Sequence, residues 1–471
     1  MPVSPSLRPS ARPGVPVRRL ERRLLACAGF EDLILLYPLY AVLFTEHGLG
    51  TAQISSLFAI ASLTGLLIEV PSGVWADLVS RRLVLICGPL LSAAGFALWV
   101  AVPSYGAFAL GFVLWGAGGS LRSGAFEALA HDELERLGAG GRYTRLMGRC
   151  TAVSATATAV ATAVAGPVHA LGGYPVLGIA SVAACLLCAA AAAGLPEHRH
   201  RSGATRGCSD PGSGSAAGCG SDRGSGSGPD RGSASDSAAG SGAGSGSASG
   251  ADLGSGSGSA SGAAARPGPV ATLRLGLAEA RGSGSVRYAL LMAVVLTAIW
   301  GALDEYVPLL AAESGAAVEH IPFLVLAVWA GVTAGGLLAD RADRLSGGAV
   351  RLSGLFPAGA LTAAGALLAS GALLGGAAGF LLLGLAFLVF QAADVVADAR
   401  LQSAITGPSR ATVTSLAGFG GSAVTLLVYA VYGAASGLLG HAQLFALFAL
   451  PCAAVAAVMA HTGRTAGRER S

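Results

Sequence analysis

The chain has 471 residues, of which 53% are hydrophobic and 12% are charged, and its formal net charge is +4. Soluble domains carry roughly a quarter charged residues, so this composition excludes an ordinary soluble fold and indicates a chain whose solvent is largely a lipid bilayer. Lysine is absent, and the abundant arginine, alanine and glycine are typical of a GC-rich coding bias. The small positive charge therefore gives no reason to expect a nucleic-acid partner.

Twelve long apolar runs dominate the sequence. About 20 apolar residues cross a hydrocarbon core of roughly 30 Å. Runs of that length predict twelve membrane helices, six on each side of a central gap. They are expected at residues 24–45, 53–75, 83–102, 106–130, 147–167, 175–195, 288–311, 321–340, 352–372, 375–397, 411–434 and 441–461.

The residues before the first run are rich in proline, serine and arginine, which predicts a disordered arm over 1–23. A cleavable secretion signal is the alternative. The apolar run from Leu24 to Phe44 is too long for the core of such a signal, and more spans follow. We therefore interpret it as the first membrane helix.

Arginines alternate between loops. They occur in the arm, at Arg81 and Arg82, at Arg341 and in the tail, whereas the loops near 46–52 and 168–174 contain none. Positive residues mark cytoplasmic loops. With an even number of helices, this alternation places both termini in the cytoplasm.

The central gap is rich in glycine and serine, which predicts a flexible coil. A tether between two halves is the simple interpretation, and a regulatory docking site within it is the alternative. The expected divisions are a disordered cytoplasmic arm over 1–23, a six-helix bundle over 24–196, a disordered cytoplasmic linker over 197–286, a second six-helix bundle over 287–462, and a cytoplasmic tail over 463–471.

One short charged sequence occurs twice. Residues 73–82 read GVWADLVSRR and residues 336–344 read GLLADRADR, each following an apolar run. Glu127 and Asp394, in the fourth and tenth predicted helices, keep a similar separation. Two halves in the same orientation, joined by a cytoplasmic linker, form a parallel repeat with a central substrate path.

These repeated sequences resemble the loop between helices two and three of the major facilitator superfamily, roughly Gly-x-Leu-Ala-Asp-Arg-x-Gly-Arg-Arg. The resemblance covers nearly all of the chain outside the arm, linker and tail. It implies an all-α membrane protein with twelve transmembrane helices in two pseudo-symmetric six-helix bundles. The first copy departs from the pattern at Trp75, Leu78 and Ser80. The matching positions are Gly73, Ala76, Asp77, Arg81, Arg82, Gly336, Leu338, Ala339, Asp340 and Arg341.

In the resembled family this loop holds the cytoplasmic ends of the helices together in one conformation. The alternative is that its charges only set topology, which leaves the repeated aspartate unexplained. A small residue such as Gly73 also lets neighbouring helices approach closely. The candidates for a cytoplasmic gate are Gly73, Asp77, Arg81, Arg82, Gly336, Asp340, Arg341 and Asp394.

Charged residues inside predicted spans are costly and indicate function. Glu31 and Asp32 lie in the first helix, and Asp304 and Glu305 lie in the seventh, its counterpart in the repeat. Adjacent carboxylates in a low dielectric oppose each other's ionisation, so one of each pair is a candidate to take up a proton near neutral pH. The alternative is that one of each pair faces a crevice or the interface and has no role.

Arg122 is the one arginine well within a predicted span. In drug–proton antiporters of the resembled family, an arginine of this helix is tied to proton transfer. Alternatively, Arg122 neutralises Glu127 or Glu31. Aromatic residues that share the seventh helix with its carboxylates are expected to line a cavity, whereas Trp99, near a helix end, is expected at the membrane interface. The candidates for the proton and substrate path are Glu31, Asp32, Arg122, Glu127, Asp304, Glu305, Trp300 and Tyr306.

Gly166 and Pro167 end the fifth predicted helix. Antiporters of the resembled family carry a Gly-Pro here, followed by a Gly-Gly. Gly172 and Gly173 are displaced from that spacing. The match favours export over uptake.

The leading hypothesis is therefore a plasma-membrane secondary transporter that exports a small apolar or cationic compound in exchange for protons, by alternating access. Uptake or facilitated movement of a sugar or metabolite is the alternative. Such substrates need amide and hydroxyl groups, and the chain has no asparagine and few glutamines. We expect a small-molecule substrate and the bilayer as partners, no nucleic acid, and a monomer.

An enzyme or a non-transporting membrane sensor is a remote alternative. The sequence has no phosphate loop, metal-ligand spacing or nucleophile triad, so we expect no cofactor, no metal and no ATP site. Cys185 and Cys188 have the spacing of a redox motif but lie in an apolar segment, where free thiols behave as small hydrophobes.

Overall fold

A computed structural model describes residues 14–78, 80–122, 124–196, 284–347, 355–404 and 410–468. These residues form helices and short connections, with no strand among them. Within them, seven helical stretches are long and apolar enough to cross a membrane. The predicted linker over 197–286 lies outside the described residues up to Gly284, where helix α9 begins.

The helices form two bundles, which we call the N-half (residues 14–196) and the C-half (residues 284–468). The helices of the N-half are α1 (Val15–Glu31), α2 (Tyr40–Glu46), α3 (Thr51–Leu78), α4 (Arg81–Ala101), α5 (Tyr105–Arg122), α6 (Ala125–Arg136), η1 (Gly140–Arg142) and α7 (Tyr143–Ala193). Those of the C-half are α9 (Gly284–Asp304), α10 (Val307–Glu313), η2 (Val318–His320), α11 (Ile321–Gly347), α12 (Leu355–Leu374), α13 (Gly376–Ala404), α14 (Arg410–Ala435), α15 (His441–Leu447) and α16 (Ala449–Arg468).

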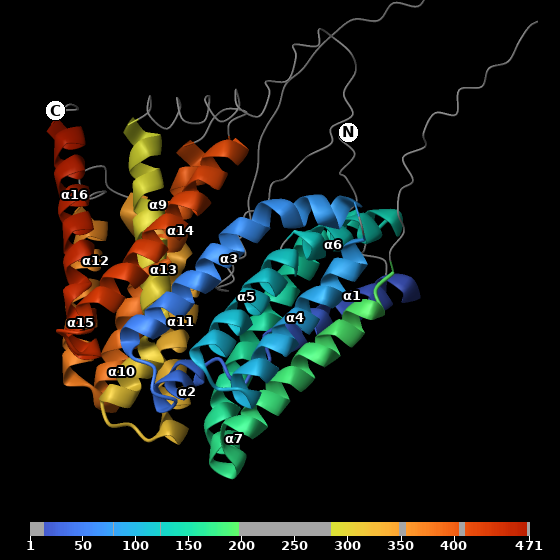
Figure 1. The fold of residues 1–471 in the computed structure, drawn as a ribbon. Helices are drawn as coiled ribbons and strands as arrows, with labels where there is room; N and C mark the ends of the chain where they lie inside the picture. Colours follow the sequence, from blue (N-terminus) through green and yellow to red (C-terminus); the bar gives the residue numbers. More distant parts are fainter. Residues whose placement is uncertain are drawn as a thin grey trace, which may run out of the picture.

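The two halves meet at one end of the molecule and diverge at the other (Figure 1). We call the first the contact end; it contains α2, α10 and α15. We call the second the arginine end; there α3 leads into α4 and α16 ends (Figure 1). The halves pack together through α3 against α14, α7 against α11 and η2, and α2 against α10. This arrangement places residues from both halves side by side at the contact end.

The first predicted helix differs from the structure in two ways. It begins at Val15 rather than at residue 24, and Leu20 and Leu24 are buried against the N-half. Part of the arm predicted over 1–23 is therefore an ordered helix, because its apolar residues recur on one face. The helix also ends at Glu31, and residues 32–39 lead into α2 instead of continuing the predicted segment to residue 45.

Two other predicted helices are interrupted. The segment 106–130 divides into α5 and α6 at Gly124, whose φ of 75° lies in a region that glycine adopts without steric cost. The segment 288–311 divides between Asp304 and Val307, and Pro308 occupies the first turn of α10, where its missing N–H costs nothing. Hydrophobicity alone detects the run but not the break.

The predicted helices 147–167 and 175–195 are both found, as the two helices within α7. The first continues through Pro167, and the two are separated by a kink at Gly173, whose φ of 63° and ψ of −162° are not helical. The predicted helices 352–372 and 375–397 are likewise separate, because α12 ends at Leu374 and α13 begins at Gly376.

Glycine contacts bring helix pairs together in both halves. In the N-half, a Cβ atom at Gly95 of α4 would lie 2.8 Å from the carbonyl oxygen of Gly111 of α5. In the C-half, a Cβ atom at Gly384 of α13 would lie 2.8 Å from the carbonyl oxygen of Ala327 of α11. Small residues permit this approach, which gives helices van der Waals contact where lipid supplies no hydrophobic force.

An aromatic core fills the contact end of the N-half. Trp99 is fully buried, and its Nε1 donates to the carbonyl oxygen of Phe108 at 3.1 Å. The Trp99 ring lies 4.7 Å from that of Phe112 and 5.6 Å from that of Tyr40. The prediction of Trp99 as an interfacial anchor is therefore wrong, because its helix end is covered by neighbouring helices.

Candidate functional site

The contact end joins the halves through polar side chains. The Tyr40 hydroxyl, at the start of α2, donates to the carboxylate of Glu305 in the break between α9 and α10. Tyr40 is almost completely buried, so this hydrogen bond is shielded from solvent. The breaks in the first and seventh predicted helices thus bring a phenol and a carboxylate together across the two halves.

Tyr306 adds a second link beside the first. Its hydroxyl donates to Ser55 Oγ of α3 at 2.8 Å, and its ring is stacked on that of Tyr432 of α14, with centroids 3.7 Å apart. Phe58 of α3 contacts the edge of the same ring at a centroid distance of 5.3 Å. Tyr306 is therefore enclosed by both halves.

His441 extends these contacts toward the outer surface of the contact end. Its Nδ1 lies 2.8 Å from the Tyr432 hydroxyl, and its Nε2 lies 3.5 Å from Thr51 Oγ1 of α3. We refer to Tyr40, Ser55, Glu305, Tyr306 and Tyr432 as the contact-end cluster. Separating the halves here breaks the Tyr40–Glu305 and Ser55–Tyr306 hydrogen bonds.

Gly166 also lies between the halves. A Cβ atom on Gly166 of α7 would overlap the carbonyl oxygen of Glu319 in η2 and would lie 3.5 Å from the Phe323 ring. The glycine thus allows α7 to approach the C-half. Pro167 follows it within α7, and the backbone break comes later, at Gly173.

The N-half contains one ion pair among the predicted path residues. Arg122 Nε, in the last turn of α5, lies 3.1 Å from Glu31 Oε1 at the end of α1. Arg122 Nε makes no hydrogen bond within the described residues, so the contact is mainly an attraction between charges. The Cys188 thiol of α7 donates to Glu31 Oε2 at 3.2 Å. Of the two carboxylates considered as partners of Arg122, the structure places Glu31 beside it, whereas Glu127 is exposed in the first turn of α6.

In each pair of adjacent carboxylates, one member makes the polar contacts described above. Within the described residues these are Glu31 and Glu305, and all four side chains, including Asp32 and Asp304, are half-buried. Asp304 Oδ1 is buried and accepts no hydrogen bond from the described part of the chain. Trp300 Nε1, one turn earlier on α9, is likewise buried without an acceptor there.

Asp394 of α13 is half-buried and contacts α9. It accepts a hydrogen bond from the Thr297 hydroxyl of α9. The side chain of Arg400, six residues further along α13, lies outside the described residues. The sequence offered no sign of the Thr297 contact, because the two residues belong to helices distant in the chain.

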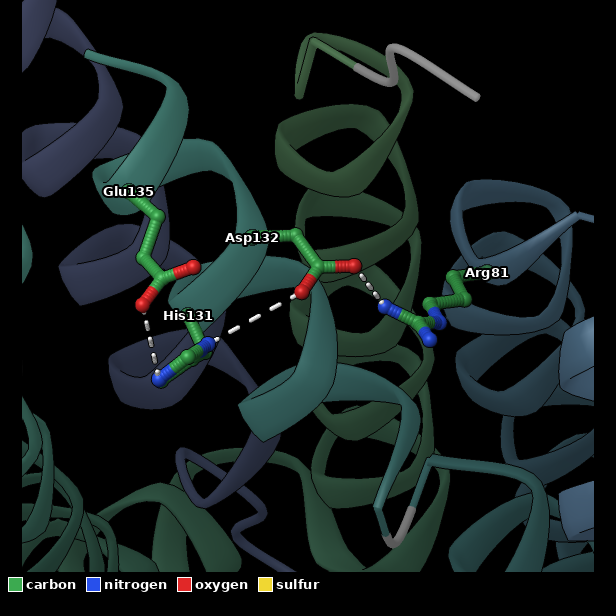
Figure 2. A network of polar contacts seen from close by, with 4 residues as sticks. All are labelled: Arg81, His131, Asp132 and Glu135. Carbon is green, nitrogen blue, oxygen red and sulfur yellow. Dashed lines mark hydrogen bonds and ion pairs between the residues drawn. The ribbon is translucent and has the colours of Figure 1, made fainter. Parts of the chain in front are cut away.

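At the arginine end, Arg81 forms an ion pair with Asp132 of α6 (Figure 2). His131 stands between two carboxylates, with Nδ1 3.8 Å from Asp132 Oδ1 and Nε2 3.7 Å from Glu135 Oε1 (Figure 2). The sequence identified Arg81 but not Asp132 as its partner. The network connects the start of α4 to α6.

For the remaining gate candidates, the structure describes few contacts or only the backbone. Arg82 points to the carbonyl oxygen of Leu195 at 3.5 Å. Gly336 is buried on α11 and Arg341 is exposed near the end of that helix. The side chains of Gly73, Asp77 and Asp340 lie outside the described residues. Within the described residues, no group of three metal-ligating side chains occurs.

Comparison with known proteins identifies the family. Residues 24–428 match the sequence profile of the Major Facilitator Superfamily. The chain belongs to the major facilitator superfamily. It is a multi-pass membrane protein of a family of transporters for small molecules, as its resemblance implied. No curated protein matches this sequence.

Solved structures of transporters share the fold. The nucleoside transporter NupG has a TM-score of 0.61 and 12% identity, covering 96% of this chain and 99% of its own. A bacterial homologue of the iron transporter ferroportin, in an inward-facing state, has a TM-score of 0.58 and 15% identity, covering 96% and 98%. A bacterial homologue of the human lysosomal transporter Spinster, inward-facing and unoccupied, has a TM-score of 0.59 and 14% identity, covering 97% and 98%.

Proposed function

We propose that this major facilitator protein is a secondary active transporter that exports a small apolar or cationic compound in exchange for protons. The contact-end cluster is the observation that carries the proposal. Its two hydrogen bonds across the halves exist only while the contact end is closed. An alternating-access transporter needs contacts of this kind, which favour one conformation and are lost in the other.

Glu305 supplies the link to protons. It accepts the hydrogen bond of Tyr40 through a carboxylate oxygen, and a proton bound at that oxygen competes with the Tyr40 donor. Proton uptake at Glu305 therefore favours separation of the halves, whereas proton release favours the closed contact end. Asp304 lies beside it and keeps a second carboxylate in the same region.

The distribution of arginines supports the orientation. Arg81, Arg82 and Arg341 lie at or near the arginine end, and positive residues favour the cytoplasm. We infer that the arginine end and both termini are cytoplasmic, that twelve helices cross the plasma membrane, and that the closed contact end faces outward. In this proposal the protein is a monomer, catalyses no reaction and uses neither a cofactor nor ATP. The proton gradient drives transport.

Transport into proteoliposomes tests the proposal. The purified chain is reconstituted, an imposed pH gradient drives uptake of organic cations, and the gradient is then collapsed with a protonophore. We expect movement against the substrate gradient only while the pH gradient lasts. Glu305→Gln, which keeps an acceptor but cannot exchange a proton, should lose gradient-driven accumulation and keep downhill exchange.

Glu313→Gln is the matched control, because Glu313 of α10 accepts the Ala442 N–H at 3.0 Å within the C-half. It should accumulate substrate as the wild type does. Accumulation by Glu305→Gln at the wild-type level would contradict the role of Glu305. Wild-type transport that ignores the gradient would leave facilitated movement or uptake of a metabolite, the alternative function.

A further inference from the structure

The facing surfaces of α9 and α13 carry a set of polar groups that the contact-end cluster does not use. On α9, Thr297 and Trp300 are three residues apart and Asp304 follows after four more, so they share one face. On α13, Phe387, Gln391 and Asp394 follow the same pattern. We call these six residues the α9–α13 face.

Two contacts establish that these surfaces meet. The Trp300 ring packs edge-on against the Phe387 ring, with centroids 6.2 Å apart. The Thr297 hydroxyl donates to the Asp394 carboxylate. Gln391 lies between Phe387 and Asp394 along α13, one turn from the first and less than one turn from the second.

Three atoms of this face are buried without a partner in the described part of the chain. They are Trp300 Nε1, Asp304 Oδ1 and Gln391 Oε1. Trp300 is 8% exposed and Gln391 is 6% exposed. Leaving a buried polar group unpaired costs free energy, so three such atoms on one face need an explanation. A ligand that supplies hydrogen bonds provides it.

The charges of the surrounding helices indicate the sign of that ligand. Within the described residues neither Asp304 nor Asp394 forms an ion pair. The arginines of α9, α11, α13 and α14 lie in the parts of these helices toward the arginine end, whereas Asp304 ends α9 at the other end: they are Arg287, Arg341, Arg344, Arg400 and Arg410. The N-half differs, because Arg122 offsets Glu31. Asp304, which no described cation contacts, together with the nearby aromatic ring of Trp300 on the same helix face, matches an organic cation through charge and cation–π attraction.

We propose that the α9–α13 face binds the ammonium group of an organic amine substrate, with Asp304 and Gln391 accepting its N–H bonds and Trp300 and Phe387 packing against its apolar part. Trp300 Nε1 remains available to donate to an oxygen of the substrate. This inference rests on the proposed transport function and names its substrate class. Asp394, held by Thr297, contributes negative charge at the other end of the face.

Equilibrium binding in detergent tests this without a proton gradient. The full chain is titrated with 2-phenylethylamine, 3-phenylpropylamine and tryptamine, and separately with 2-phenylethanol, 3-phenylpropanol and tryptophol, their neutral counterparts. We expect the amines to bind and to raise the thermal unfolding midpoint, and the alcohols to bind at least about tenfold more weakly, because they lack the charged donor.

Asp304→Asn should weaken amine binding about tenfold and leave alcohol binding unchanged. Asp398→Asn is the matched control, because Asp398 is an exposed carboxylate on α13 outside the α9–α13 face, and it should bind amines as the wild type does. Gln391→Leu removes an acceptor that lacks a partner, so it should weaken amine binding about threefold without lowering the stability of the unliganded chain.

Three outcomes would overturn the inference: no amine of the panel binds the wild type, the alcohols bind as tightly as the amines, or Asp304→Asn keeps the preference for amines. A loss of stability in unliganded Gln391→Leu would assign that residue a structural role instead. Amine binding together with gradient-independent transport would remove the proposed proton coupling and leave this site in place, so the two proposals fail separately.

Discussion

The two halves treat their buried acidic groups differently. In the N-half, Glu31 lies beside the guanidinium of Arg122 and accepts the Cys188 thiol, so its charge is balanced within the bundle. In the C-half, Glu305 depends on Tyr40 of the other half, and Asp304 has an oxygen that no described residue reaches. The N-half thus pairs Glu31 within its own bundle, whereas the carboxylates at the end of α9 depend on the other half or lack a described partner. This difference supports the proposal that the C-half binds the substrate and the proton.

Removal of Arg122 is the strongest way to break this comparison. Arg122→Leu leaves Glu31 without its cation and should lower the free energy of unfolding by about 2 to 3 kcal/mol, between the values for exposed and fully buried pairs, since Arg122 is partly exposed. Thermal unfolding in detergent measures the loss. The double variant Arg122→Leu/Glu31→Gln should recover most of it, and Asp304→Asn should change stability by less than about 1 kcal/mol. Failure of the double variant to recover would show that packing, not charge, is lost.

We expect close helix packing to contribute equally to the stability of the two halves. The halves would then differ in how their carboxylates are paired and not in how their helices pack. Gly95→Val in the N-half and Gly384→Val in the C-half each force a side chain against a backbone oxygen 2.8 Å from the new Cβ. Each should lower the free energy of unfolding by about 2 kcal/mol, as overpacking does. The same unfolding experiment compares them. Gly106→Val, where a Cβ would meet nothing within 4 Å, is the control. A large difference between the two tight sites would contradict equivalent packing.

A single hydrogen bond helps to hold the halves together at the contact end. Tyr306→Phe removes the hydrogen bond to Ser55 but keeps the ring stacked on Tyr432, so it should weaken the contact end by about 1 kcal/mol. The readout is the distance between spin labels at the contact end, one in each half. We expect the population with separated halves to rise about fivefold. Tyr105→Phe, on the N-half surface beside Ser56, is the control. An unchanged distance distribution in Tyr306→Phe would remove Tyr306 from the contact between the halves.

The smallest effect is expected at the arginine end. Arg81→Gln removes an ion pair whose side chains are 28% and 55% exposed, and such pairs contribute less than about 1 kcal/mol. The loss should shrink further in high salt, because exposed charges are screened. Unfolding midpoints at low and high salt measure it. A loss comparable to that of Arg122→Leu would show that the arginine-end network matters more to folding than its exposure implies.

Much of the fold follows from hydrophobicity, and less of the site does. Each predicted apolar run corresponds to one or two helices in the described part of the chain, because a helix that crosses a bilayer needs an apolar run of about this length. The breaks at Gly124 and after Asp304 were not predicted, since an apolar run hides a local change of backbone direction. The position of Trp99 near a helix end predicts an interfacial residue, but it gives no information about the neighbouring helices that bury the ring.

The candidate residues were found more readily than their partners. A carboxylate or an arginine within an apolar run is visible in one sequence, which is why Glu31, Arg122 and Glu305 were singled out. Their partners come from elsewhere in the chain: Tyr40 is 265 residues from Glu305, and Asp132 is 51 residues from Arg81. Only the packing of the bundles decides such pairs.

The early start of α1 has a consequence for the order in which the chain assembles during synthesis. Glu21 is buried, and its Oε1 accepts from Arg142, 121 residues later, while its Oε2 lies 3.9 Å from Arg149. A nascent chain that ends before residue 142 contains Glu21 without either cation. We therefore expect α1 to reach its final packed position only after the start of α7 has been synthesised. On this basis the N-half assembles as one unit rather than one helix at a time.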